Sequence, residues 1–220
     1  MTMVFSMFLT LHIITGAIGL LTGILNILRK KGDHTHKLIG RVFYVSMLTA
    51  SISALVLASL HSNYFLFMVG IFTLYMVSSG QYYLRRKQKD KLGSKTIEWG
   101  ITILMLISGL VFIGFGILTL VKSNLFGLVF LTFGGLGLLF VQQDFKNYTG
   151  KATTDNYWLL GHIQRMTGSF IAALTAFLVV NAKYFPEQIP GFVYWLLPTV
   201  ILTPLINKWC REYKVKKVSS

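Results

Sequence analysis

Seven long apolar segments dominate this sequence of 220 residues. They span roughly residues 4–28, 38–60, 64–84, 97–121, 125–143, 159–181 and 191–209. A helix of about 20 apolar residues crosses the ~30 Å hydrocarbon core of a bilayer. Each segment is expected to be a helix, because no water is available there to its backbone groups. The sequence therefore predicts an all-α polytopic membrane bundle of seven transmembrane helices, forming one domain over residues 1–220.

Basic residues are concentrated in alternate linkers. Of the 21 Lys and Arg residues, all but Lys122 and Lys183 lie at or after the ends of the first, third, fifth and seventh segments or just inside the helices that follow. Cytoplasmic loops of membrane proteins carry this excess. The pattern predicts a multi-pass protein of the bacterial cytoplasmic (inner) membrane, with its N-terminus outside and its C-terminus in the cytoplasm. It also explains the net charge of +14 by contact with anionic lipid rather than nucleic acid.

A stripe of small residues follows one face of the first segment. His12, Gly16, Gly19 and Gly23 are separated by steps of four, three and four residues, which place them on one side of a helix. Small residues let two membrane helices approach closely. The glycines are therefore predicted to pack against another helix, with His12 pointing into the bundle. Glu98, at the start of the fourth segment, is the other predicted buried polar residue.

Ionisable groups gather near the predicted cytoplasmic ends of the second and sixth helices. They are His34, His36, Arg41, His162 and Arg165. Charged groups at membrane depth are costly and are candidates for function. His12 lies about 24 Å from the inner end of its helix, at 1.5 Å per residue, so it cannot share a ligand with this cluster.

Several interpretations of this cluster remain open. The arginines can mark the cytoplasmic side and extend to lipid phosphates, with the histidines at helix caps. His36 and His162 can ligate haem b, with Arg41 and Arg165 near its propionates. The two arginines can instead bind an anionic ligand, such as a lipid head group or a quinone-like molecule.

A metal centre is the least favoured interpretation. Asp33, His34, His36 and His162 could contribute ligands, but structural zinc sites typically include Cys, and the only cysteine is Cys210. No metal site is therefore predicted. The chain also lacks a phosphate-binding Walker loop, a nucleophile elbow and the H-E-x-x-H motif, so no catalytic residue is assigned.

Two weaker patterns concern helix architecture. Pro198 and Pro204 lie inside the seventh segment, where each removes a backbone hydrogen bond and favours a kink. A faint repeat relates residues 4–84 to 125–209, with the fourth helix as the joint, because similar Leu-Thr-Ala triplets follow His36 and His162 at equal distance. The sequence thus allows a parallel three-plus-one-plus-three duplication.

The first part of the chain resembles a large bacterial family of predicted integral membrane proteins known only as a domain of unknown function. The resemblance covers roughly residues 8–88 and rests on these positions: His12, Gly16, Gly19, His36, Gly40, Arg41 and Tyr44. The segment FTLYMVSSGQYYLRRK is similar too. The resemblance implies a multi-pass architecture and candidate site positions, and it implies no reaction.

Function is less constrained than fold. The leading prediction is a membrane protein that binds haem or takes part in redox chemistry through histidines at helix ends. The alternatives are a non-enzymatic carrier or receptor for a small lipophilic or anionic ligand and a scaffold for membrane assembly. The sequence leaves open whether the protein is an enzyme.

Overall fold

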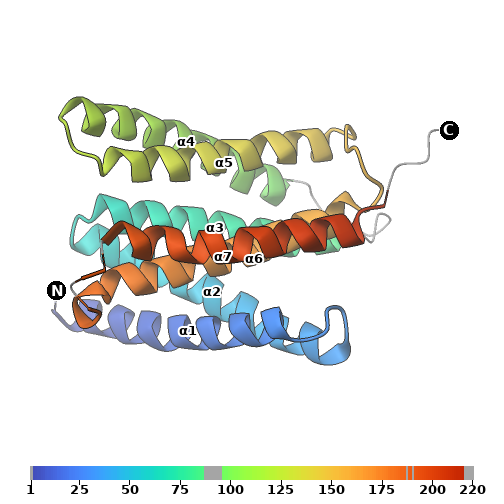
Figure 1. Cartoon of the computed structure of the whole chain (residues 1–220), viewed down its shortest axis with the longest axis horizontal. Coiled ribbons are helices and arrows are strands. Elements are labelled where there is room, and N and C mark those ends of the chain that lie inside the picture. Colours follow the sequence, from blue (N-terminus) through green and yellow to red (C-terminus); the bar gives the residue numbers. More distant parts are fainter. Residues whose placement is uncertain (1, 87–95, 187, 190, 216–220) are drawn as a thin grey trace.

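The computed structural model describes residues 2–86, 96–186, 188–189 and 191–215. The described chain forms seven α-helices: α1 (Thr2–Leu28), α2 (His34–Leu60), α3 (Tyr64–Arg85), α4 (Thr96–Val121), α5 (Gly127–Tyr148), α6 (Tyr157–Val180) and α7 (Gly191–Tyr213) (Figure 1). A short 3-10 turn, Ala182–Tyr184, precedes α7. The prediction of an all-helical fold with seven helices is confirmed.

The helices form one elongated bundle in three tiers (Figure 1). The α4–α5 hairpin lies on one side, α3, α6 and α7 lie in the middle, and the α1–α2 hairpin lies on the other side. The most extensive packing joins α1 to α2, α4 to α5 and α3 to α6. The central α3–α6 pair thus separates the two hairpins. The internal repeat that relates residues 4–84 to 125–209 stays a prediction.

Two helix boundaries bear on the candidate site. α2 begins at His34, four residues earlier than predicted, because the Asp33 side chain caps it by accepting a hydrogen bond from the His36 backbone N–H at 2.6 Å. α5 continues to Tyr148, so the predicted end at residue 143 is wrong. Asp144 and Asn147 are buried residues of the helix rather than parts of a loop.

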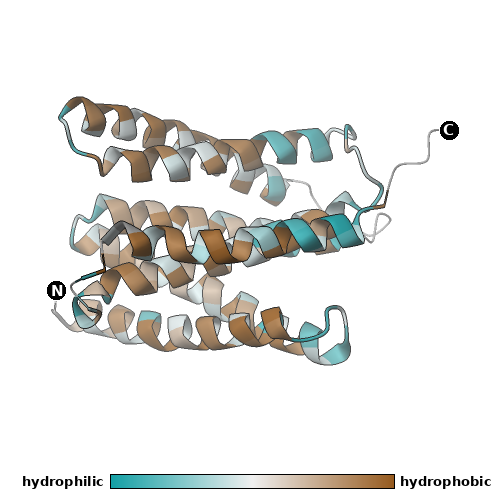
Figure 2. Cartoon of the chain, in the orientation of Figure 1, coloured by the Kyte–Doolittle hydropathy of each residue, from teal (hydrophilic) through white to brown (hydrophobic). Residues whose placement is uncertain are grey.

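Six helices, α1 to α6, are long and apolar enough to cross a membrane. α7 is not among these helices when the described residues are considered, and Pro198 and Pro204 lie inside it. Large apolar side chains are exposed along α1 and α4, which indicates contact with lipid rather than water. In Figure 2 the hydrophilic residues gather at the bundle end that holds the α1–α2 turn and the C-terminal parts of α5 and α7.

The glycines of α1 differ in their surroundings. A Cβ atom at Gly19 would lie 2.7 Å from the Sδ atom of Met47 on α2, and one at Gly23 would collide with the rings of Phe170 and Phe43. A Cβ atom at Gly16 would meet no atom within 4 Å. Of the three positions predicted to pack closely, Gly19 and Gly23 therefore make close contacts in this bundle.

Candidate functional site

A cavity of about 660 Å³ lies at the polar end of the bundle, next to the α1–α2 turn. It is partly open and is lined by residues of α1, α2, α3, α6 and α7. Three of the sequence-predicted site residues, His36, Arg41 and His162, line it. Pockets of 300–1,000 Å³ with mostly apolar walls and a few polar groups are typical of small-molecule sites. This cavity has that character.

The deep end of the cavity is apolar. Gly23 of α1, Phe43 of α2 and Phe170 of α6 meet there, and both phenylalanines belong to one buried cluster. The lack of a side chain at Gly23 is what lets the two rings approach α1. These three residues form the floor of the cavity. An aliphatic or aromatic group that packs against this floor is removed from water, which is favourable.

His36 and His162 lie at one level above this floor. His36 is seven residues from Phe43 along α2, and His162 is eight residues from Phe170 along α6. At a rise of 1.5 Å per residue, these separations correspond to about 10–12 Å along the helix axes. The structure therefore places this predicted pair together beside a single cavity.

The hydrogen bond of His162 defines how its ring is oriented. Its Nδ1 atom lies 3.0 Å from the carbonyl oxygen of Gly80 on α3. A carbonyl oxygen can only accept, so Nδ1 is the protonated nitrogen and Nε2 carries a lone pair. Among the described residues, Nε2 has no hydrogen-bond partner. His162 therefore offers the cavity an acceptor, or a nitrogen that can ligate a metal.

The basic side chains around the cavity differ in availability. Lys31 donates to the carbonyl oxygens of Asn26, Ile27 and Arg29 at 2.7, 2.6 and 3.0 Å, and its ammonium lies 4.4 Å from the Trp209 ring centre. Burial lowers the pKa of Lys31. This lysine therefore caps α1 and holds it to α7.

Lys37 and Arg41 are the two other basic side chains of the cavity. Both are exposed, and neither forms a side-chain ion pair with a described residue. These two cations are therefore the groups best able to meet an anionic ligand.

Arg165 points elsewhere, into the interior between α3, α5 and α6. Its Nη2 atom lies 2.7 Å from Oδ1 of Asp144, and both side chains are fully buried. The guanidinium also donates to Gln143 Oε1 at 2.9 Å and to the carbonyl oxygen of Phe140 at 3.1 Å. The anion that Arg165 binds in this structure is therefore an internal carboxylate.

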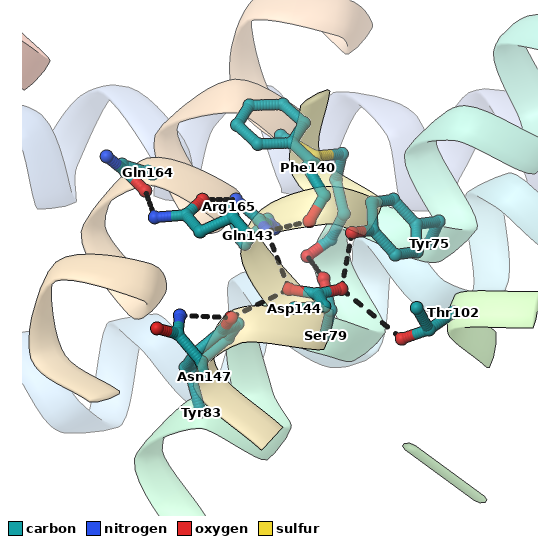
Figure 3. A network of polar contacts seen from close by, with 11 residues as sticks. Tyr75, Ser79, Tyr83, Thr102, Phe140, Gln143, Asp144, Asn147, Gln164 and Arg165 are labelled. Carbon is teal, nitrogen blue, oxygen red and sulfur yellow. Dashed lines mark hydrogen bonds and ion pairs between the residues drawn. The ribbon is translucent and has the colours of Figure 1, made fainter. Parts of the chain in front are cut away.

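Asp144 is the centre of a larger polar network (Figure 3). Besides Arg165, it accepts hydrogen bonds from the hydroxyl groups of Tyr75 at 2.5 Å, Tyr83 at 2.7 Å and Thr102 at 3.3 Å. The amide of Asn147 donates to the Tyr83 hydroxyl at 2.9 Å. The network joins α3, α4, α5 and α6. Such hydrogen bonds offset much of the cost of burying the charge pair, although Nε of Arg165 has no hydrogen-bond partner in the described part of the chain.

Sequence reasoning missed Asp144 because it assigned this residue to a cytoplasmic linker. The signal that could have found it is a helical stripe of buried positions along α5: Phe130, Gly134, Gly137, Val141, Asp144 and Asn147. Steps of three and four continue through the polar residues without a break. A polar residue on such a stripe points into the bundle.

The remaining predicted polar residues lie outside the cavity. His12 is half-buried and its Nδ1 atom is 2.9 Å from the carbonyl oxygen of Ala50 on α2. Glu98 is buried and forms an ion pair with Arg86, whose guanidinium lies 3.9 Å from the ring centre of Tyr148. His34 is exposed at the start of α2. None of the three lines the cavity.

In the described part of the chain, no group of three or more His, Cys, Asp or Glu residues is arranged to hold a metal ion.

Comparisons with protein-family models, with curated proteins and with solved structures yield no match. The resemblance of residues 8–88 to a family of unknown function stays a prediction.

Proposed function

We propose that this protein binds a small anionic amphipathic molecule in the cavity between α1, α2, α3, α6 and α7, as a carrier or receptor. The observation that carries the proposal is the layering of one cavity: an apolar floor of Gly23, Phe43 and Phe170, with His36 and His162 above it. Lys37 and Arg41 add cations that lack a described ion-pair partner. A molecule with an apolar body and an anionic head matches this order of groups.

The proposed setting is a bacterial inner membrane crossed by all seven helices, with the N-terminus outside. The gathering of polar residues at one end of the bundle supports this orientation (Figure 2). We expect single cysteines, introduced after replacement of Cys210, to be labelled from the cytoplasm at Lys31 and Lys151 and from outside at Ser62 and Ser123. Lys87, another turn predicted to be cytoplasmic, lies outside the described residues. Labelling of Lys151 and Ser123 from the same side would contradict the proposed orientation.

Ligand binding can be measured with phosphatidylmethanol that carries brominated acyl chains, because Trp158 and Trp209 line the cavity and bromine quenches tryptophan fluorescence. We expect quenching that saturates in detergent micelles. The Lys37→Gln, Arg41→Gln double variant should bind about tenfold more weakly, since it loses charge-assisted contacts to the phosphate.

The matched control removes two charges from the same turn without touching the cavity. Arg29 and Lys30 are exposed and do not line it. The Arg29→Gln, Lys30→Gln variant should therefore retain the affinity of the wild-type protein. Equal weakening in both double variants would mean that charge attracts the lipid to the surface in general, and it would refute the cavity site.

Haem b is a second candidate ligand, favoured by the orientation of His162. Histidines that ligate metals usually donate their other ring N–H to a carbonyl or carboxylate, as His162 does to Gly80. His36 at the same level would be the second ligand, and Lys37 and Arg41 would meet the propionates. Bound haem would supply one-electron redox chemistry. Haemin added to the protein should then give a Soret band that is lost in His36→Ala and His162→Ala but kept in His12→Ala.

A further inference from the structure

We infer that the head group of the bound amphiphile carries a hydroxyl, and that the hydroxyl donates a hydrogen bond to Nε2 of His162. This inference rests on the proposed function, since it concerns the same cavity. It narrows the ligand from any anionic amphiphile to one whose head group combines an anion with hydroxyl donors. A phosphodiester of glycerol has this chemistry.

The tautomer of His162 is determined by close packing of two helices. A Cβ atom at Gly80 would lie 3.0 Å from the Cβ atom of Arg165 and 2.8 Å from Sδ of Met166. The absence of a side chain at Gly80 therefore brings the α3 backbone close enough to α6 for its carbonyl oxygen to accept from Nδ1 at 3.0 Å. Because the carbonyl cannot donate, Nε2 remains an acceptor whenever the ring is neutral.

Among the described residues nothing satisfies this acceptor. His162 lines the cavity, and its one hydrogen bond is to Gly80. A ligand group without a donor would displace water from Nε2 and leave a buried acceptor unpaired, which is costlier than the gain from one hydrogen bond. The cavity should therefore discriminate against head groups that lack a donor.

A second polar group of the cavity favours more than one hydroxyl. Gln81 follows Gly80 on α3, lines the cavity and is half-buried, and its amide has no hydrogen-bond partner in the described part of the chain. Its amide can both donate and accept. One hydroxyl at His162 and another at Gln81, with the phosphate facing Lys37 and Arg41, would satisfy all of these groups together.

The test compares two lipids that differ only in the hydroxyls. Phosphatidylglycerol and phosphatidylmethanol with identical brominated acyl chains carry the same single negative charge. We expect phosphatidylglycerol to quench the tryptophan fluorescence of wild-type protein with at least about fivefold higher affinity, the worth of one hydrogen bond. In His162→Phe the preference for phosphatidylglycerol should fall to what the Gln81 contact alone contributes, whereas His162→Gln, which keeps an acceptor, should retain more of the preference. His34→Phe, at an exposed histidine outside the cavity, should behave as wild type.

The outcomes separate this inference from the proposed function. Equal binding of the two lipids to wild-type protein would overturn the hydroxyl recognition and leave the anionic site intact. A preference that is undiminished in His162→Phe would overturn the role of His162. If neither lipid binds, both the anionic site and the recognition of its head group are wrong. If His162→Phe fails to fold, the wild-type comparison still tests the hydroxyl recognition, and His162→Gln tests the role of His162.

Discussion

The Asp144→Leu variant should be destabilised by about 3–5 kcal/mol, because it leaves the guanidinium of Arg165 buried without its carboxylate. Tyr75 and Tyr83 would lose the same acceptor. Thermal unfolding of the purified protein in detergent measures the effect. Asp155 is an exposed carboxylate in the α5–α6 linker, and Asp155→Leu changes the net charge equally. An unfolding temperature that is the same in both variants would show that the Asp144 network does not stabilise the bundle.

Removing both charges provides the companion measurement. Replacing a buried ion pair by apolar residues of similar size is often neutral, whereas removing one partner is not. Asp144→Leu with Arg165→Met should therefore recover much of the lost stability. Recovery should be incomplete, since the hydroxyl groups of Tyr75, Tyr83 and Thr102 still lack their acceptor. A double variant less stable than Asp144→Leu would contradict the ion-pair explanation.

Gly134→Leu should destabilise the protein by about 1–3 kcal/mol or more, because α4 and α5 approach each other backbone to backbone at this point. A Cβ atom at Gly134 would lie 3.0 Å from the carbonyl oxygen of Gly109 and 3.1 Å from the side chain of Ile113. A carbonyl of a helix cannot move aside as a flexible side chain can. The α4–α5 pair would have to separate.

Gly135 supplies a matched control one residue away. A Cβ atom there would meet nothing within 4 Å. Gly135→Leu gains the same helix propensity and the same apolar volume, and it should be neutral or slightly stabilising. The difference in unfolding temperature between the two variants isolates the packing contribution. Equal stability of the two variants would mean that the α4–α5 contact is more compliant than the structure indicates.

The helical architecture follows from the amino-acid sequence alone. Apolar length decides which segments become helices in a membrane, and seven helices follow at close to the predicted boundaries. The depth of a residue along a helix can also be predicted, since the helix rises 1.5 Å per residue. For that reason the common level of His36 and His162 could be predicted before their shared cavity was known.

Which side chains contact one another depends on how the helices pack. Depth along an axis says nothing about the rotation of a helix or the order of its neighbours, and these determine partners. Arg165 lies only three residues from His162 along α6 and so at a similar depth. Its side chain nevertheless points toward Asp144 on α5 and not into the cavity. In the sequence, Lys31 is one of several basic residues in a linker. In the structure, its ammonium donates hydrogen bonds to carbonyl oxygens at the end of α1. Polar contacts between helices depend on a few ångströms of packing, so the sequence pattern alone leaves them open.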